Sequence, residues 1–487
     1  RTVPPANCPA MRRALPALAL ALAAACRAPA PPPAAAAPSL AITNVTVVDA
    51  DHGTLASGRT VVVAGNRIVA VGPPSRTPVP AGVRTLDGGG KFLIPGLWDM
   101  HVHAVWPRIA EAFMPLFVAN GVTGVREMFG TTALVDSARA AVRAGRYAGP
   151  RVVGAGNLVD GSPPVWPNSV LARTPDEGRR VVDSLRAAGA DFIKVYSRLR
   201  RDVYFAIADE ARKRGIPFAG HVPQRVTVAE ASDAGQRTME HLYGMGAGCS
   251  AQEAQWLREV EAAVASPRAW DSVVALGRTR AHEVVAAYDE AKCRALLQRL
   301  ARNGSWQVPT LTVLRNVASL DDTTYALDPR LAYLPRRFGA MWNPKNDFRT
   351  RMLTPEDYAR RRVTLRASFA VVGAMQRAGV PLLAGTDALN PYVFPGFSLH
   401  DELALLVEAG LTPAQALRAA TYAPAQFLGA TDSLGTVAPG KLADLVLLDA
   451  DPLAAVRNTT RIAAVVANGR LYDRAALDSL LAAAKGK

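Results

Sequence analysis

The sequence has few cysteines and few histidines for its length. Only 4 of its 487 residues are Cys and 7 are His. Two of the cysteines, Cys8 and Cys26, lie near the N-terminus. Cys249 and Cys293 have no partner at the spacing of a metal-binding motif. In an oxidising compartment these two could form a disulfide, and two buried thiols are the alternative, so both readings stay open.

Clustered charge is also lacking, although the charges do not balance. Lys and Arg outnumber Asp and Glu by 56 to 41, which gives a net charge of +15. Such an excess alone would suggest nucleic acid or an acidic membrane surface as a partner. However, the arginines are scattered through segments of helical pattern, and aromatic residues make up only 6% of the chain. We therefore expect no nucleic-acid interface.

The N-terminus carries an apolar segment that is too short to span a membrane. Positive residues at 11–13 precede an Ala/Leu-rich run over residues 14–25, which is typical of an export signal. The run ends at Cys26 in a sequence that resembles a bacterial lipoprotein box. We predict that residues 1–38 are a signal peptide and disordered linker. The protein is then exported, either as a soluble periplasmic protein or as a cell-envelope lipoprotein anchored through Cys26.

Alternating apolar residues appear at both ends of the remaining chain. Residues 39–92 are typical of antiparallel strands, and Gly65-Asn66 lies between two of them at a hairpin turn. The same alternation returns within residues 434–487. We predict that the two ends form one small composite domain, a β-sandwich.

Residues 93–433 alternate between short apolar strands and amphipathic helices, which predicts a parallel sheet of α/β class. Eight strands are expected, one ending near residue 103 and the others at residues 122–128, 151–156, 191–196, 217–222, 238–242, 308–313 and 380–387. Eight such strands predict a (β/α)₈ TIM barrel, whose active site lies at the C-terminal ends of the strands. Two insertions, near 244–307 and 315–378, are expected to lie over that face and select the substrate.

Residues that bind metals stand at the ends of these strands. His101 and His103 are two residues apart, so both rings point to one side of a strand. The whole set is His101, His103, Lys194, His221, His241 and Asp387. Imidazoles and a carboxylate suit Zn²⁺ or a related divalent ion. An ammonium group cannot bind a cation, so Lys194 would have to react with CO₂ to form a carbamate, and the alternative is a snorkelling or ion-paired lysine.

These motifs resemble the amidohydrolase superfamily, within which the chain is most similar to the imidazolonepropionase-like branch that includes bacterial Xaa-Pro dipeptidases. The matching segments are residues 95–103, 192–195, 220–223, 239–241, 384–387 and 438–445. Residues 122–127 and 397–403 resemble the same branch.

The resemblance implies a centre of two divalent ions, expected to be Zn²⁺. His101, His103 and Asp387 would hold the first ion, and His221 and His241 the second. Carboxylated Lys194 and a hydroxide would bridge the two ions. Paired ions would activate the hydroxide and polarise the scissile carbonyl. Asp387 would pass a proton from the attacking hydroxide to the leaving amine.

Three further residues are candidates for substrate contacts. Tyr196 would stabilise the oxyanion or bind a substrate carboxylate, unless it is an aromatic residue packed at the barrel rim. Arg126 would clamp a carboxylate, unless it pairs with a neighbouring acid. His400 would line the pocket, unless it belongs to the polar face of a helix.

The pattern as a whole predicts a binuclear metal-dependent amidohydrolase that acts on a small molecule or a dipeptide. A dipeptidase or carboxypeptidase for Xaa-Pro substrates is the leading hypothesis. A mononuclear deaminase or imidazolone-type hydrolase is the first alternative, and Lys194 argues against it. A lactonase would use the same metals. An envelope-anchored binding protein on the same scaffold would lack at least one ligand. The oligomeric state cannot be predicted from the sequence.

Overall fold

A computed structural model describes residues 36–106, 108–266, 268–347 and 349–486. The predicted signal peptide and the lipid-anchor residue Cys26 lie outside these described residues. Within the described ranges, Ala37 and the residues after it form one compact unit. None of the helices in this part of the chain combines the length and the apolar character that a membrane crossing requires.

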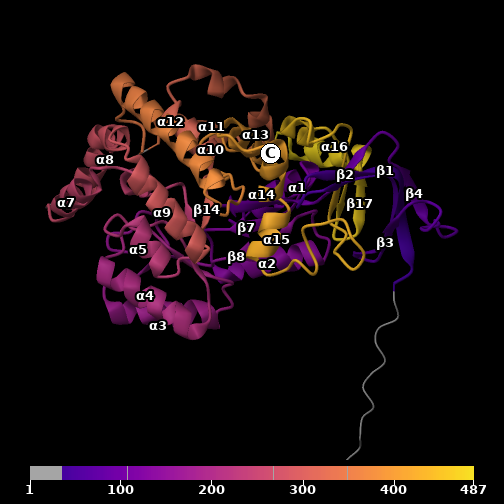
Figure 1. Ribbon diagram of the computed structural model, residues 1–487, viewed down its shortest axis with the longest axis horizontal. Helices are drawn as coiled ribbons and strands as arrows, with labels where there is room; N and C mark the ends of the chain where they lie inside the picture. Colours follow the sequence, from indigo (N-terminus) through magenta and orange to yellow (C-terminus); the bar gives the residue numbers. More distant parts are fainter. Residues whose placement is uncertain (1–35, 107, 267, 348, 487) are drawn as a thin grey trace, which may run out of the picture. The chain divides into compact units, whose positions relative to one another are not determined.

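Both ends of the chain contribute strands to one mixed sheet (Figure 1). Its strands are β1 (Pro38–Asp49), β2 (Thr54–Ala64), β3 (Arg67–Gly72), β4 (Arg84–Asp87), β5 (Phe92–Pro95), β15 (Leu445–Leu448), β16 (Ile462–Ala467) and β17 (Arg470–Asp473). The strand order is β17-β16-β15-β5-β1-β2-β3, and β4 pairs with β1. The predicted hairpin is confirmed, because Ala64 of β2 pairs with Arg67 of β3. The division into two sheets of a sandwich stays a prediction.

Two parallel sheets lie between these ends in the sequence. One contains β6 (Leu97–Val102), β7 (Val122–Glu127) and β8 (Arg151–Gly154). The other contains, in spatial order, β10 (Val170–Leu171), β9 (Leu158–Asp160), β11 (Ile193–Val195), β12 (Phe218–Gly220), β13 (Thr238–Glu240) and β14 (Trp306–Val308). Most of their apolar side chains are buried, as expected for strands covered on both faces.

Backbone hydrogen bonds connect the edges of these two sheets. Asp191 N, just before β11, donates to Gly154 O of β8 at 3.0 Å. The segment 381–388 lies between β14 and β6, where Leu383 N donates to Gln307 O and Met100 N donates to Ala384 O, both at 2.9 Å. This segment was expected to be a regular strand, but it forms only isolated bridges to its two neighbours.

The seventh predicted strand is wrong in its second half. Strand β14 ends at Val308, and helix α10 (Leu311–Ala318) follows at once. Pro309 has no N–H with which to continue a ladder. The buried Glu402 carboxylate accepts hydrogen bonds from Leu311 N at 2.9 Å and Thr312 N at 2.7 Å. This carboxylate satisfies N–H groups at the start of the helix, and the apolar run alone does not reveal it.

Helices connect and cover the strands. They include α1 (Ala110–Ala119), α2 (Thr132–Arg143), α3 (Pro175–Ala187), α4 (Arg201–Arg214), α5 (Val228–Asp233), α9 (Glu290–Asn303), α13 (Phe397–Glu408), α14 (Pro413–Ala419), α15 (Tyr422–Phe427) and α16 (Arg474–Ala484). The sequence over residues 413–428 predicts one helix, but the structure divides it into α14 and α15. The carbonyls of Ala419 and Ala420 accept hydrogen bonds from Ala384 N and Trp98 N, so they leave the helical pattern to bind the strands.

The two long insertions are mainly helical and meet each other. The first contains α6 (Met245–Gly248), α7 (Glu253–Val264) and α8 (Ala269–Ala286), and a disulfide joins Cys249 to Cys293 in α9. The second contains η1 (Thr323–Leu327), η2 (Pro329–Tyr333), α11 (Arg337–Met341) and α12 (Pro355–Arg377). Figure 1 shows α8 beside α12, and Arg278 Nε of α8 lies 3.7 Å from Asp357 Oδ1 of α12.

Candidate metal centre

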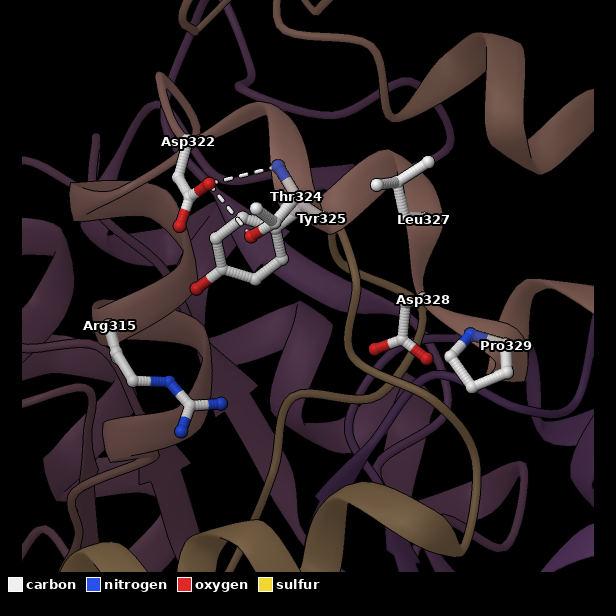
Figure 2. Close-up of a pocket in the computed structure, with 7 residues that line it drawn as sticks. All are labelled: Arg315, Asp322, Thr324, Tyr325, Leu327, Asp328 and Pro329. Carbon is white, nitrogen blue, oxygen red and sulfur yellow. Dashed lines mark hydrogen bonds between the residues drawn. The ribbon is translucent and has the colours of Figure 1, made fainter.

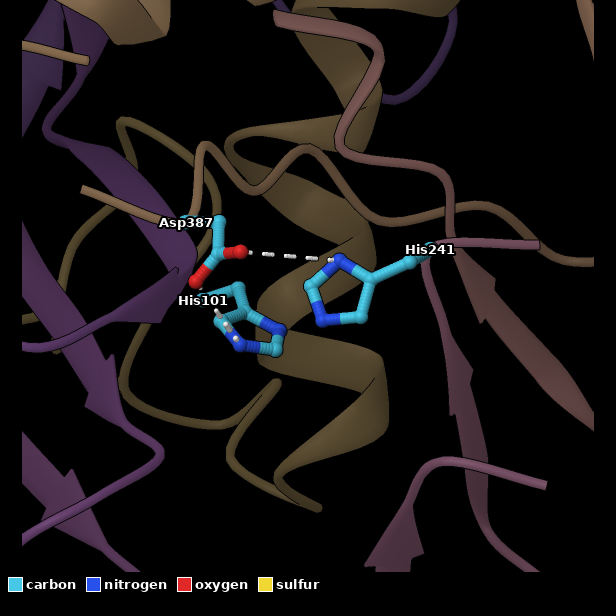
Figure 3. Close-up of side chains that lie close together, drawn as sticks. All are labelled: His101, His241 and Asp387. Carbon is cyan, nitrogen blue, oxygen red and sulfur yellow. Dashed lines mark ion pairs between the residues drawn. The ribbon is translucent and has the colours of Figure 1, made fainter. Parts of the chain in front are cut away.

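The six residues predicted to bind metal come together at one set of strand ends. His101 and Lys194 lie in β6 and β11, His221 and His241 directly follow β12 and β13, and Asp387 lies in the segment 381–388. All of them are buried except His103, whose side chain is 18% exposed. Ligand atoms of His101, His241 and Asp387 lie within 4.8 Å of one another (Figure 3).

Short distances join the other members to these three. Asp387 Oδ1 lies 2.8 Å from His103 Nε2 and 3.5 Å from His101 Nε2. Lys194 Nζ lies 3.5 Å from His101 Nε2. The ring of His221 lies 4.9 Å from the ring of His241, measured between centroids. The predicted set is therefore one continuous cluster.

Hydrogen bonds determine which nitrogen of two histidines faces the cluster. His101 Nδ1 lies 2.7 Å from Glu240 Oε2, and a carboxylate can only accept, so Nδ1 carries the proton. His241 Nδ1 lies 2.7 Å from Thr310 Oγ1, whose own proton goes to Pro309 O at 2.8 Å. His241 Nδ1 must therefore donate as well. In both rings Nε2 keeps its lone pair for a metal ion.

Buried polar atoms without partners support a bound cation. His221 Nδ1 lies 2.7 Å from Ser197 Oγ, whereas its Nε2 is buried without a hydrogen bond to any residue that the structure describes. His103 Nδ1 is also buried without such a partner, whereas Asp387 Oδ1 lies 2.8 Å from His103 Nε2. Buried polar atoms are rarely left unsatisfied, so the donor set fits a divalent metal.

Burial also sets the charge states that metal binding needs. It lowers the pKa of His101 and His221 well below the ordinary value, and lowers the pKa of His241 to about 4. These rings are neutral near pH 7, which is the form that binds metal. Burial lowers the pKa of Lys194 to about 8, which raises the fraction of neutral amine able to react with CO₂.

Three buried carboxylates behind the cluster were not predicted from the sequence. Glu240 orients His101, and Asp99 accepts hydrogen bonds from Thr386 N at 3.0 Å and from Thr386 Oγ1 at 2.7 Å, which fixes the residue before Asp387. Glu127 accepts from the N–H groups of Ala104, Val105 and Phe129, and so fixes the loop that follows His103. Each of these three carboxylates is an acidic residue within a short apolar strand, and that pattern could have revealed them.

Arg126 and His400 are not brought into the cluster. Arg126 is fully buried, donates to Met100 O at 2.7 Å and pairs with Glu240 Oε1 at 2.9 Å. This is the structural ion pair that the sequence left open as an alternative to a substrate clamp. His400 is also buried, and its ring nitrogens contact Thr459 Oγ1 at 2.9 Å and Asn120 O at 3.1 Å. His400 was expected either at the pocket wall or on a polar helix face, and these buried contacts place it at neither.

Aromatic side chains surround the opening of the cluster. The ring of Tyr196 stacks on His221 with centroids 3.8 Å apart, and Tyr196 Oη accepts a hydrogen bond from Trp166 Nε1 at 2.9 Å. Burial raises the pKa of Tyr196 well above its ordinary value, so the hydroxyl remains a donor. Tyr243, which was not predicted, lies 4.5 Å from His221 between ring centroids and is 46% exposed. Tyr196 and Tyr243 therefore present an aromatic wall beside His221.

A hollow of about 520 Å³ lies elsewhere, within the second insertion (Figure 2). It is lined by Arg315, Asp322, Thr324, Tyr325, Leu327, Asp328 and Pro329. No member of the metal cluster lines it. Asp322 hydrogen-bonds to the nearby Thr324 and so caps η1, which gives this carboxylate a structural role. The hollow and the buried cluster are therefore separate features.

Comparison with known proteins gives a family match over part of the chain. Residues 313–472 match the model of the amidohydrolase family. The structure of a Bifidobacterium longum protein assigned as a prolidase is similar with a TM-score of 0.64 and 26% identity, over 92% of this chain and 99% of that chain. The resemblance predicted from the sequence motifs is confirmed.

Curated relatives match over short segments. An adenine deaminase of Rubrobacter xylanophilus is 31% identical over 112 residues, which are 21% of this chain and 18% of that protein. An imidazolonepropionase of the same organism is 43% identical over 56 residues, which are 11% of this chain and 14% of that protein. The first curated relatives are thus matched over only 11% and 18% of their own length.

Proposed function

Because the chain carries an amidohydrolase family domain over residues 313–472, we propose that it is a metal-dependent hydrolase of a carbon–nitrogen bond. The substrate class that we favour is a dipeptide with a free carboxylate, such as Xaa-Pro. One observation carries this proposal: a buried lysine lies 3.5 Å from His101, in a cluster that also contains three further histidines and an aspartate. The likeness to a protein assigned as a prolidase supports the substrate class.

Two divalent ions, with zinc as the simplest choice, would occupy this cluster. His101, His103 and Asp387 would hold one, and His221 and His241 would hold the other. A carbamate on Lys194 would supply a further anionic ligand. Bound there, the ions would lower the pKa of a water molecule and polarise the carbonyl to be cleaved.

The residues of the chain supply positioning and proton transfer. Asp387 is placed to accept the proton of the attacking water and to deliver it to the leaving amine. The Tyr196 hydroxyl is a neutral donor suited to the carbonyl oxygen as negative charge develops there. Glu240 and Thr310 keep the His101 and His241 rings in the tautomer that a metal requires.

We also propose that the two parallel sheets are arcs of one eight-stranded barrel. The hydrogen bonds from Asp191 to Gly154 and across the segment 381–388 support closure at both edges. In this division the barrel spans about 96–433. Residues 39–95 with 434–487 would be the composite β domain, because β5 pairs with β15. Export to the periplasm or the cell envelope remains part of the proposal.

The main alternative is a deaminase or cyclic-amide hydrolase. The adenine deaminase and imidazolonepropionase relatives favour it, although they match over short segments. Lys194 distinguishes the two readings, because a single-metal site has no need for a bridging lysine carbamate. A lactonase would use the same residues.

A substrate panel tests the proposal. The zinc-loaded protein should hydrolyse Xaa-Pro dipeptides or N-acyl amino acids, and it should release no ammonia from adenine. Ammonia release from adenine, or opening of an imidazolone ring with no action on any dipeptide, would contradict the proposed substrate class and support the alternative.

A further inference from the structure

The hydroxyl of Tyr196 accepts a hydrogen bond but has no acceptor of its own within the described ranges. An indole N–H can only donate, so Trp166 Nε1, at 2.9 Å, gives its hydrogen bond to Tyr196 Oη. The ring of Tyr196 stacks on His221 with centroids 3.8 Å apart, and Lys194 Nζ lies 5.5 Å from its centre. The proton of the Tyr196 hydroxyl is therefore available for a hydrogen bond at the edge of the metal cluster.

Trp166 follows a loop that the buried carboxylate of Asp160 holds in place. Asp160 is the last residue of β9 and accepts hydrogen bonds from Gly161 N and Val165 N, both at 2.9 Å. It also accepts one from Arg198 N at 2.8 Å. Because β9 pairs with β11, the strand of the buried lysine, this loop starts from the same strand ends as the cluster. The backbone that leads to Trp166 is thus tied to the strands of the cluster.

The first insertion reaches this loop through Trp270 of α8. The guanidinium carbon of Arg198 lies 3.4 Å from the centre of the Trp270 ring, which is the distance of direct stacking. The same guanidinium donates from Nη1 to Pro163 O at 2.7 Å and to Pro164 O at 3.3 Å. Trp270 therefore limits the positions of Arg198, which in turn fixes two carbonyls close to Trp166.

The second insertion contacts the indole of Trp166 through Arg349, whose guanidinium carbon lies 6.0 Å from the ring centre. Asp347 Oδ1 accepts from Arg349 Nε at 2.9 Å, which fixes the plane of the group. Arg349 Nη1 donates to Asn390 Oδ1 at 2.7 Å, and Asn390 Nδ2 donates to Asp387 O at 3.0 Å. Both insertions therefore restrict the position of Trp166.

We propose that Trp166 is a positioning residue, which holds the Tyr196 hydroxyl in place to donate a hydrogen bond to the carbonyl oxygen at the scissile bond. A hydroxyl that already accepts one hydrogen bond is polarised and becomes a stronger donor. A donor that is fixed before the reaction also needs no reorientation as negative charge develops on the oxygen. The indole N–H thus acts on the substrate only through Tyr196. This role rests on the proposed amide hydrolysis and on the place of Tyr196 in it.

A double-mutant cycle with the zinc-loaded full chain tests this role on an Xaa-Pro dipeptide. Tyr196→Phe should lower kcat by about 100-fold, and Trp166→Phe, which keeps an aromatic ring, should lower it by about tenfold with KM nearly unchanged. In the Tyr196→Phe protein, the added Trp166→Phe change should have no further effect, because the hydroxyl that Trp166 positions is gone. Trp256→Phe in α7 is the matched control and should behave as the wild type.

Three results of this cycle would overturn the role of Trp166 while dipeptide hydrolysis by the wild type still stands. Trp166→Phe could lower kcat equally with and without the Tyr196 hydroxyl, it could leave the wild-type kcat unchanged, or Tyr196→Phe could keep full activity. Trp270→Ala leaves the Trp166 indole in the chain, so it serves if Trp166→Phe does not fold. It should lower kcat by a smaller factor, and only when the Tyr196 hydroxyl is present.

Nuclear magnetic resonance of protein with isotope-labelled tryptophan tests the contact without any turnover. The signal of Trp166 Nε1–H, assigned by its loss in Trp166→Phe, should move upfield and exchange faster with water in Tyr196→Phe. The signal of Trp256 should not move. An unchanged Trp166 signal in Tyr196→Phe would overturn the proposed role. If no dipeptide is cleaved, the hydrolase proposal fails, and this signal still decides whether Trp166 holds Tyr196.

Discussion

At the scale of single residues, the metal-facing nitrogens depend on partners that never touch the metal. Thr310 has one hydroxyl proton, and because it gives that proton to Pro309 O, His241 must donate to Thr310. Glu240 likewise accepts the proton of His101 Nδ1, and Glu240 itself forms an ion pair with Arg126. These contacts fix the tautomers of two proposed metal ligands.

We predict that Thr310→Val weakens metal binding without unfolding the protein. Valine has the same shape but leaves His241 Nδ1 without an acceptor, so zinc affinity should fall by about 10- to 100-fold. Competition with a chromophoric chelator measures this directly. Thr324→Val removes an exposed hydroxyl of η1 and should leave the affinity unchanged. An affinity equal to that of the wild type in Thr310→Val would show that His241 is not a ligand in the proposed tautomer.

A second prediction concerns the buried carboxyl of Glu402, whose pKa burial raises to about 7 from its ordinary value of 4.5. Between these values the unfolded chain loses the proton while the folded chain keeps it, so stability falls as the pH rises. The shift corresponds to a loss of up to about 3 kcal/mol across that window. Asp99 and Glu127 act in the same direction, since burial raises their pKa values to about 7 and about 8.

Urea unfolding between about pH 5 and pH 8 tests the contribution of Glu402. In Glu402→Gln the free energy of unfolding should fall less steeply with pH than in the wild type, whatever its absolute value. Glu408→Gln, on the same helix and exposed, should keep the wild-type slope. Equal slopes in all three proteins would mean that Glu402 is ionised when buried.

The cluster was predictable from the sequence because its residue types are unusual in or next to short apolar strands. Histidines and an aspartate at strand ends are uncommon, and so is a lysine within an apolar strand such as that of Lys194. Arg349 was not predictable, because it lies in an insertion without periodic pattern and its position depends on Asn390 and Trp166. Arg126 was left open between a substrate clamp and a structural ion pair, since its partner Glu240 is distant in the sequence.

At the scale of elements, tertiary hydrogen bonds set boundaries that local patterns missed. The apolar run near residue 310 suggested a strand, yet Glu402 satisfies the first N–H groups of α10 there. The helix expected after residue 413 ends early, because the carbonyls of Ala419 and Ala420 bind the strands. At both places, tertiary hydrogen bonds outweigh the intrinsic preference of the residues for helix or strand.

The disulfide is the other feature that acts at this scale. Cys249 and Cys293 enclose α7 and α8, and they are 44 residues apart in the sequence. Replacing both by alanine should lower the stability of the protein by about 2–4 kcal/mol, because the unfolded chain gains freedom. Calorimetry of the wild type and the variant, each with and without reductant, measures the loss. Reductant should destabilise the wild type only, and an effect on both proteins would rule out this bond as the cause.

At the scale of the whole molecule, the site depends on segments from nearly the full described chain. Pairing of β5 with β15 joins the two ends of the chain next to β6, which carries His101. The two insertions meet through α8 and α12. Arg349 of the second insertion donates a hydrogen bond to Asn390, which in turn donates to Asp387 O. The proposed metal ligands thus come from strand ends, whereas the insertions contribute contacts to the loop that carries one of them.

The proposed chemistry depends above all on Lys194 completing a two-metal centre. Metal analysis of the purified wild type beside Lys194→Ala tests this directly, with Lys213→Ala as an exposed control. We predict close to two divalent ions per chain for the wild type and the control, and at most about one for Lys194→Ala, with loss of amide hydrolysis. One ion per chain in all three proteins, or two ions and full activity in Lys194→Ala, would contradict the two-metal centre.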